Sequence, residues 1–179
     1  MFNATHIRRL KVFGKQELAE LSAVTIDCVE GGASIGFLLP MTATKAEAFW
    51  TSATASALRG ERLVLVAQDA AGVILGTVSV IWAVPENQPH RAEIAKMQVH
   101  RRARRCGVGT ALLAAAESAA LDAGRALLVL DTVTGSDAYR LYARQGWQRC
   151  GEIPNYALWP DGRLCATTVF YKSLPARNI

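Results

Sequence analysis

The sequence lacks the features of a membrane-spanning or secreted protein. Its 179 residues contain no uninterrupted apolar run of about 18 residues, the length that a transmembrane helix needs. Near the N-terminus, His6, Arg8, Arg9 and Lys11 stand where a signal peptide would have an apolar block. We therefore expect a soluble, cytoplasmic protein with no membrane partner.

Cysteine is scarce, and its spacing argues against a metal site. The sequence contains neither a C-x-x-C motif nor a histidine pattern beside its four cysteines, which are Cys28, Cys106, Cys150 and Cys165. This pattern favours reduced thiols over a disulfide framework or a zinc site, so we predict that no metal is bound. Internal repeats and low-complexity linkers are also absent. We predict one domain over residues 1–179, with an N-terminal strand and helical pair in 1–60 and a core in 61–179.

A formal net charge of +5 allows a nucleic acid, a membrane surface or an anionic small molecule as partner. Arg101, Arg102, Arg104 and Arg105 form the main cluster of positive charge. No aromatic residues alternate with them, as binding of single-stranded nucleic acid would require. A ligand with a diphosphate explains the cluster without a nucleic acid, although charge alone fits a solvated basic corner equally well.

Hydrophobic periodicity predicts a mixed α/β sheet with helices on both faces. A capping box at Thr44-Lys45-Ala46-Glu47 opens the second helix, and the continuous apolar run 126–130 indicates a strand covered on both faces. Residues 62–68 and 73–84 read as an antiparallel hairpin, and the order strand, helix, strand over 91–131 implies a parallel pair. Strands are predicted over 5–12, 62–68, 73–84, 91–99, 126–130, 147–153 and 164–171, and helices over 15–29, 44–58, 107–124 and 136–144.

A basic, glycine-containing turn joins the strand 91–99 to the helix that starts near Gly107. The first N–H groups of a helix have no internal partner, and the helix dipole adds positive potential, so a pyrophosphate can be bound there. Gly107 and Gly109 let the backbone come close to a ligand. The predicted anion site consists of Arg104, Arg105, Cys106, Gly107, Val108, Gly109 and Thr110.

The order R-x-x-G-x-G in residues 104–109 resembles the acyl-CoA pyrophosphate loop of the GNAT N-acetyltransferases. The segment from Tyr142 to Trp147 is similar to the Y-x-x-x-G-F segment of the same family. The resemblance implies acetyl-CoA as co-substrate and a GNAT fold, a mostly antiparallel mixed sheet with a splayed central parallel pair. It assigns the backbone of Met97, Gln98 and Val99 to the pantetheine arm, and places Ser136 and Tyr139 beside the cofactor.

The same resemblance implies three catalytic residues. Tyr142 is the expected acid for the departing thiolate, while Glu93 and Asp131 are the expected bases for the acceptor amine, often acting through water. Each has a structural alternative that the sequence leaves open. Tyr142 can pack in the core, Glu93 can pair with an arginine, and Asp131 can accept a turn hydrogen bond.

Further segments resemble the tabtoxin resistance protein family, whose members acetylate a β-lactam amino acid. They are 31–37, 91–94 with Lys96, 151–156 and 160–164. The resemblance implies a small-molecule amine as substrate, with Ser34 and Phe37 near the acceptor. Arg101, Arg105 and Cys106 depart from the usual residues of the loop, and we expect them to alter cofactor affinity.

The alternatives are a protein or peptide N-acetyltransferase, a non-catalytic acyl-CoA-binding module, and a nucleic-acid-binding protein. Glu93, Asp131 and Tyr142 together argue against a mere binding module, and we expect no nucleic acid partner. One of the four tryptophans is a candidate for a contact in a homodimer.

Overall fold

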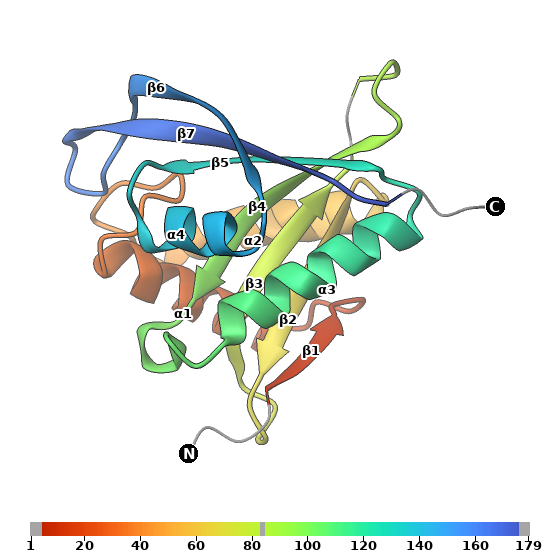
Figure 1. The fold of residues 1–179 in the computed structure, drawn as a ribbon. Helices are drawn as coiled ribbons and strands as arrows, with labels where there is room; N and C mark the ends of the chain where they lie inside the picture. Colours follow the sequence, from red (N-terminus) through yellow and green to blue (C-terminus); the bar gives the residue numbers. More distant parts are fainter. Residues whose placement is uncertain (1–4, 83–84, 176–179) are drawn as a thin grey trace.

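A computed structural model describes residues 5–82 and 85–175, and a seven-stranded sheet lies at its centre (Figure 1). The strand order is β1-β2-β3-β4-β5-β7-β6, and only β4 and β5 pair in parallel. The strands are β1 (His6–Arg9), β2 (Arg62–Gln68), β3 (Ile74–Ile81), β4 (Arg91–Val99), β5 (Leu127–Val133), β6 (Gln148–Leu158) and β7 (Leu164–Ser173). The helices are α1 (Lys15–Glu30), α2 (Ala43–Leu58), α3 (Val108–Asp122) and α4 (Asp137–Arg144), with a 3₁₀ turn at Arg101–Ala103. The predicted mixed, mostly antiparallel sheet is confirmed.

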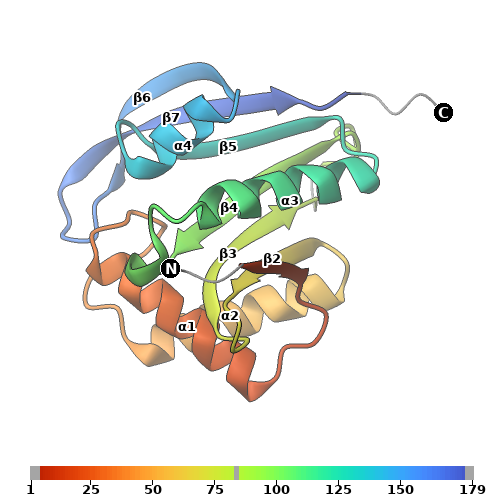
Figure 2. The ribbon, with the colours of Figure 1, turned by 60° about the horizontal axis from the view of Figure 1, so that its bottom comes forward.

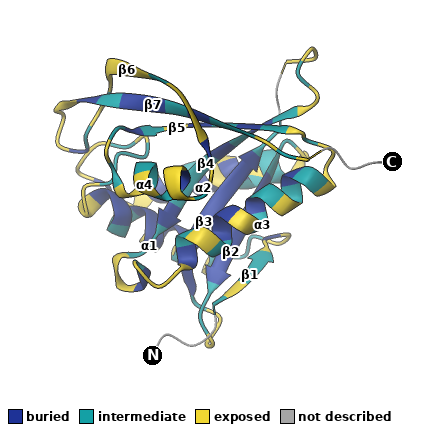
Figure 3. Ribbon diagram, viewed as in Figure 1, coloured by how far each residue is buried: buried dark blue, intermediate teal, exposed yellow. Residues whose placement is uncertain are grey.

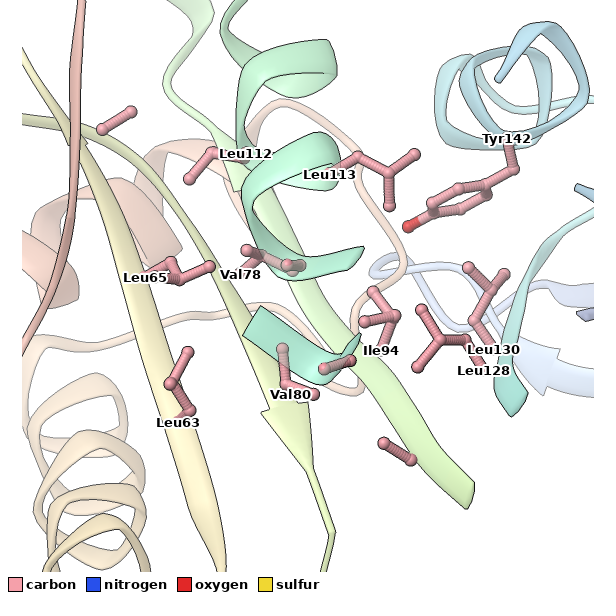
Figure 4. Close-up of a cluster of buried hydrophobic side chains, with 14 of the residues drawn as sticks. Leu63, Leu65, Val78, Val80, Ile94, Leu112, Leu113, Leu128, Leu130 and Tyr142 are labelled. Carbon is pink, nitrogen blue, oxygen red and sulfur yellow. The ribbon is translucent and has the colours of Figure 1, made fainter. Parts of the chain in front are cut away.

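Helices cover both faces of this sheet (Figure 2). On one face, Val64 and Val66 of β2 pack in a cluster with α1 and with Trp50 of α2. On the other face, alternate residues such as Leu63 and Leu65 pack in a cluster with α3 and α4 (Figure 4). Because side chains alternate along a strand, this division assigns every strand residue to the α1/α2 face or to the α3/α4 face. No helix within the described ranges is long and apolar enough to cross a membrane.

The central parallel pair is short, as the predicted splay requires. β4 and β5 pair only where Arg91–Glu93 lie beside Leu127–Val129. Beyond Glu93 and Val129 the two strands separate, and we call the gap between them the seam. On the other side of β4, the register with β3 shifts between Thr77 and Ser79, so β4 contains a bulge. The bulge includes Lys96, which has a positive φ of 52°.

The N-cap of the second helix lies two residues before the predicted one. Its N-cap is Thr42, whose hydroxyl accepts a hydrogen bond from Lys45 N, and not Thr44. Met41 and Ala46 are both buried in one cluster with Val29 of α1. These two positions flank the cap as the apolar residues of a hydrophobic staple do, so packing against α1 fixes the start of the helix.

Several strands differ from their predicted form. β5 is not buried on both faces, because only alternate residues such as Leu128 and Leu130 are buried. β6 continues beyond Ile153 to Leu158, since Pro154 is tolerated in a strand at the edge of the sheet. Figure 3 shows that β6 is largely exposed, in contrast to the buried β3. The first strand is shorter than predicted, and the predicted end of the third strand, Val84, lies outside the described residues.

Gly76 of β3 lies where a side chain would strike the neighbouring strand. A Cβ atom at this position would lie 2.7 Å from the backbone oxygen of Gln98 and 3.2 Å from Leu112 Cδ1. We expect Gly76→Ala to lower the free energy of unfolding by about 1–3 kcal/mol, because the backbone must move to relieve the overlap. Urea unfolding measures this change. Gly151→Ala in β6 is the matched control, since its Cβ would meet nothing within 4 Å, and an equal loss in both variants would contradict the prediction.

Candidate active site

The turn before α3 has the backbone of an anion site. Gly107, the N-cap of α3, has a φ of 81° and no side-chain cap, and a Cβ atom there would meet nothing within 4 Å. The first N–H groups of a helix have no partner within the helix, so those of α3 are available to bind a pyrophosphate. Gly109 has a structural role in addition to the one predicted. A Cβ atom at Gly109 would lie 3.2 Å from Leu141 Cδ2, so this glycine lets α3 approach α4.

The four arginines of the turn have different partners. Arg101 pairs with Asp27 of α1 through its backbone N–H and its Nε, at 2.7 and 2.9 Å. Arg102 lies 3.9 Å from Asp69 of the β2–β3 connection. Arg104 donates from Nε to the carbonyl of Val99 at 3.2 Å and stays half-buried. Arg105 is exposed beside Gly107 and has a positive φ of 63°. Arg105 is thus an exposed cation two residues before the N-cap of α3, and it lies, like Arg104, within electrostatic range of Asp137.

The remaining predicted cofactor residues lie around the turn and the seam. Cys106 and Thr110 are exposed at the start of α3. Ser136 is the N-cap of α4 and accepts a hydrogen bond from Tyr139 N at 3.1 Å, so its hydroxyl is engaged by the helix. The Tyr139 ring packs against Phe170, with 5.3 Å between ring centroids.

Within β4, the side chain of Gln98 is buried and points away from the seam. Its Oε1 accepts a hydrogen bond from Thr25 Oγ1 of α1 at 2.8 Å, and that hydroxyl also accepts from Trp50 Nε1 at 2.9 Å. Met97 and Val99 pack against the cluster on the α3/α4 face. This arrangement leaves the backbone of Met97, Gln98 and Val99 as the part of β4 that borders the seam.

Both predicted bases lie on the α1/α2 face beside the seam. Arg62, Ile81, Glu93 and Val129 oppose one another across β2, β3, β4 and β5, so their side chains share one face with those of β2 that pack on α1 and α2. Asp131 is two residues beyond Val129 on the same strand, and therefore on the same face. The two carboxylates thus border the place where β4 and β5 separate.

Tyr142 approaches the seam from the opposite face. It extends from α4 into the cluster on the α3/α4 face, and Figure 4 shows its hydroxyl pointing towards Leu113 and Ile94. Its side chain is buried against Trp147 and Phe170. Burial raises the pKa of the Tyr142 phenol, and the charge of Asp131 adds to this effect. The phenol therefore keeps its proton throughout the neutral range, as an acid must, while its packing also fits the structural alternative.

Ser34 and Phe37 lie in the connection 31–42 between α1 and α2, which we call the acceptor loop. They line a hollow of about 210 Å³ together with Gly36, Leu38, Ala157 and Leu158. The loop is held against the β6–β7 hairpin, because Ser34 Oγ donates to the carbonyl of Leu158 at 2.7 Å and Leu39 N donates to that of Pro160 at 2.9 Å. The structure therefore brings the two predicted substrate residues into one concave site.

Two cations at the site were given no role by the sequence. Arg62 and Lys96 lie within electrostatic range of Glu93, and Lys96 also within range of Asp131. Burial lowers the pKa of Lys96; Arg62 acts in the same direction, whereas Asp131 and Glu93 oppose it. Two signals in the sequence pointed to Lys96: it is a lone charge in the segment 94–97, otherwise Ile, Ala and Met, and it belongs to the segments that resemble the tabtoxin resistance protein family.

Comparison with known proteins decides the family. A family profile described as the acetyltransferase (GNAT) domain matches residues 60–149, half of the chain. The chain belongs to the GNAT acetyltransferase family. The matched residues include the seam, the turn before α3 and Tyr142. We therefore describe the protein as an acetyl-CoA-dependent N-acetyltransferase of the GNAT family.

Solved structures of similar fold agree with this assignment. A ribosomal-protein-alanine N-acetyltransferase from Brucella melitensis has a TM-score of 0.76 at 25% identity, over 94% of this chain and 99% of its own. An N-acetyltransferase from Staphylococcus aureus has a TM-score of 0.78 at 19% identity, over 97% and 100%. A Salmonella typhimurium structure, yncA with its cofactor acetyl-CoA, has a TM-score of 0.77 at 21% identity, over 99% and 98%. The family assignment gives acetyl-CoA as the cofactor, and these structures share the fold. Among the described residues, no three His, Cys, Asp or Glu side chains gather as a metal site.

The charge of Arg105 gives a test of the cofactor site. We expect Arg105→Asn to weaken acetyl-CoA binding about fivefold and to reduce its salt dependence, because an exposed charge beside a phosphate contributes about 1 kcal/mol. Asparagine tolerates the left-handed backbone of this position, so the change isolates the charge. Titration calorimetry at low and high salt measures both effects. Arg102→Gln is the control, since Arg102 faces Asp69. Equal affinity in wild type and Arg105→Asn would refute the assignment.

Proposed function

We propose that this GNAT enzyme acetylates a primary amine of a small molecule, and that the acceptor binds in the hollow under the acceptor loop. The observation that carries the proposal is the arrangement at the seam, with Glu93 and Asp131 on the face of the acceptor loop and Tyr142 on the other face. Residues 1–60 would then supply most of the acceptor side and residues 61–179 the acetyl-CoA side of one domain.

The chemistry follows from these positions. Acetyl-CoA supplies an acetyl group activated as a thioester. Arg105 and the N–H groups at the start of α3 would hold its pyrophosphate, and the backbone of residues 97–99 its pantetheine arm. Backbone N–H groups of β4 at the seam would stabilise negative charge that develops on the carbonyl oxygen. Glu93 and Asp131 would take the proton of the amine, directly or through water, as the amine nitrogen forms a bond to the carbonyl carbon. Tyr142 would give its proton to the thiolate that leaves when the carbon–sulfur bond breaks, and would regain one from solvent.

The size of the hollow favours a small acceptor. A volume of about 210 Å³ lies below the roughly 300–1,000 Å³ of sites for drug-sized ligands. Hydrogen bonds to Leu158 and Pro160 also tie the acceptor loop down over the hairpin, which leaves less room for a peptide chain. An amino acid of the tabtoxinine-β-lactam kind fits these limits, and its acetylation would make the protein a toxin resistance enzyme.

A protein N-terminus is the second candidate acceptor. The Brucella melitensis structure at 25% identity is described as a ribosomal-protein-alanine N-acetyltransferase. Release of CoA thiol from acetyl-CoA distinguishes the two candidates when it is measured with amino acids, the tabtoxin-derived β-lactam, aminoglycosides, polyamines and short peptides. We expect release with the β-lactam or a close amino-acid analogue. Release with peptides alone would replace the proposed acceptor with a protein.

A further inference from the structure

Lys96 occupies an unusual position on the central strand. Ala95 opposes Ser79 and Gln98 opposes Thr77, so Lys96 and Met97 together face the single residue Val78. The extra residue of this bulge gives Lys96 its positive φ of 52°. The bulge turns the lysine side chain away from the regular alternation of β4 and towards the acceptor loop.

The partners of the ammonium group come from the acceptor loop and from α2. Lys96 Nζ donates a hydrogen bond to the carbonyl of Ile35 at 2.7 Å. It also lies 5.4 Å from the ring centroid of Phe37 and 5.5 Å from that of Phe49, within the range of cation–π attraction. The two rings meet edge to face, with 5.2 Å between centroids.

Gly36 completes this contact. A Cβ atom at Gly36 would lie 3.0 Å from Lys96 Nζ, and the residue has a φ of 89°. The chain therefore passes over the ammonium group at a distance that a larger residue would crowd. The carbonyl of Ile35, the backbone of Gly36 and the ring of Phe37 all approach one charge.

We propose that Lys96 is the positioning residue that couples the acceptor loop to the bulge of β4. The proposal rests on the proposed function, in which this loop binds the acceptor beside the seam. Lys96 fixes the distance between the acceptor hollow, lined by Phe37, and the backbone that borders the thioester. Acceptor binding then depends on the Lys96 ammonium group, whereas acetyl-CoA binding at the start of α3 does not.

The test compares Lys96→Met, which keeps the length of the side chain and removes the charge, with the wild type. We expect the KM for the acceptor to rise about tenfold, while the dissociation constant of acetyl-CoA changes by less than about twofold. Hydrogen exchange of the backbone amides at 34–39 is expected to become about tenfold faster, because the loop loses its charged anchor. Lys96→Arg should restore part of the acceptor KM, since it restores a cation.

Two further variants separate this role from a general effect on the fold. Phe49→Leu removes one aromatic face and leaves Lys96 in place, so we expect a smaller change in the same direction. Lys45→Met is the matched control. Lys45 is exposed, and it donates to Pro40 O in the same loop at 3.0 Å. We expect wild-type values for it.

Each outcome decides the proposal. Unchanged loop exchange in Lys96→Met would overturn it, even if no acceptor had been identified. Equal losses of acetyl-CoA affinity and acceptor affinity would also overturn it, because Lys96 would then support the whole site. Faster loop exchange in a protein that acetylates none of the small amines would support the coupling and refute the proposed acceptor class.

Discussion

Tyr142→Phe is expected to lower kcat about a hundredfold and to leave acetyl-CoA affinity near that of the wild type, because a positioned acid contributes about 10²–10⁴ in rate. The phenyl ring preserves the packing against Trp147 and Phe170, so the change removes the proton donor alone. Steady-state rates of thiol release, together with calorimetric binding of acetyl-CoA, measure both quantities.

The pKa of Tyr142 adds a further expectation. Burial and the charge of Asp131 raise it above the ordinary value of 10.0, so the phenol remains protonated as the pH rises towards 10. Loss of activity below that pH should therefore not come from Tyr142. Tyr171→Phe is the control, because it removes the hydroxyl by which Tyr171 of β7 donates a hydrogen bond to Gln148 of β6. Normal turnover in Tyr142→Phe, or a large loss of acetyl-CoA affinity, would assign Tyr142 to packing.

The double variant Glu93→Gln/Asp131→Asn has the second large expected effect. We expect kcat/KM at pH 7 to fall about a hundredfold, since no carboxylate remains to take the proton of the amine. Only acceptor molecules that are already deprotonated would then react. Their fraction grows with pH up to the pKa of the amine, so the rate profile should move towards alkaline pH. Rates of thiol release between pH 6 and 10 measure the shift.

The single variants Glu93→Gln and Asp131→Asn show which carboxylate matters more. A larger alkaline shift in one of them identifies the principal base, and equal shifts indicate that the two act through one water network. Glu47→Gln, an exposed change on α2, controls for the loss of a surface carboxylate. If both single variants and the double variant of Glu93 and Asp131 keep the wild-type pH profile, these two residues are not the bases.

The elements governed by local sequence were predicted well. β2 and β4 have the predicted bounds, because apolar runs and the turn residues that flank them define these strands without help from distant parts of the chain. The start of α2 depended instead on packing of Met41 against α1, which local capping signals do not contain. Val129 is half-buried and Asp131 is exposed in β5. This likewise depends on what covers the strand, which an apolar run alone does not specify.

Much of the candidate site could be placed, but its electrostatics could not. The loop at 104–109, the two carboxylates and Tyr142 were predicted from motifs, and their catalytic roles remain predictions. The pairing of Arg101 with Asp27 joins residues that are 74 positions apart, so no local pattern indicates that this arginine is already engaged. The orientation of Lys96 depends on a bulge opposite Val78, and the register of two neighbouring strands determines it.

The short pairing of β4 with β5 has a consequence for the stability of the protein. Backbone hydrogen bonding across the sheet is confined there to three residue pairs, so β1–β4 and β5–β7 behave as two half-sheets that α3 bridges. A cofactor arm lying between the strands would serve as a substitute strand. By mass action, acetyl-CoA bound in this way would raise the free energy of unfolding of the protein. The concentration of acetyl-CoA would thus affect the stability of the enzyme as well as its rate.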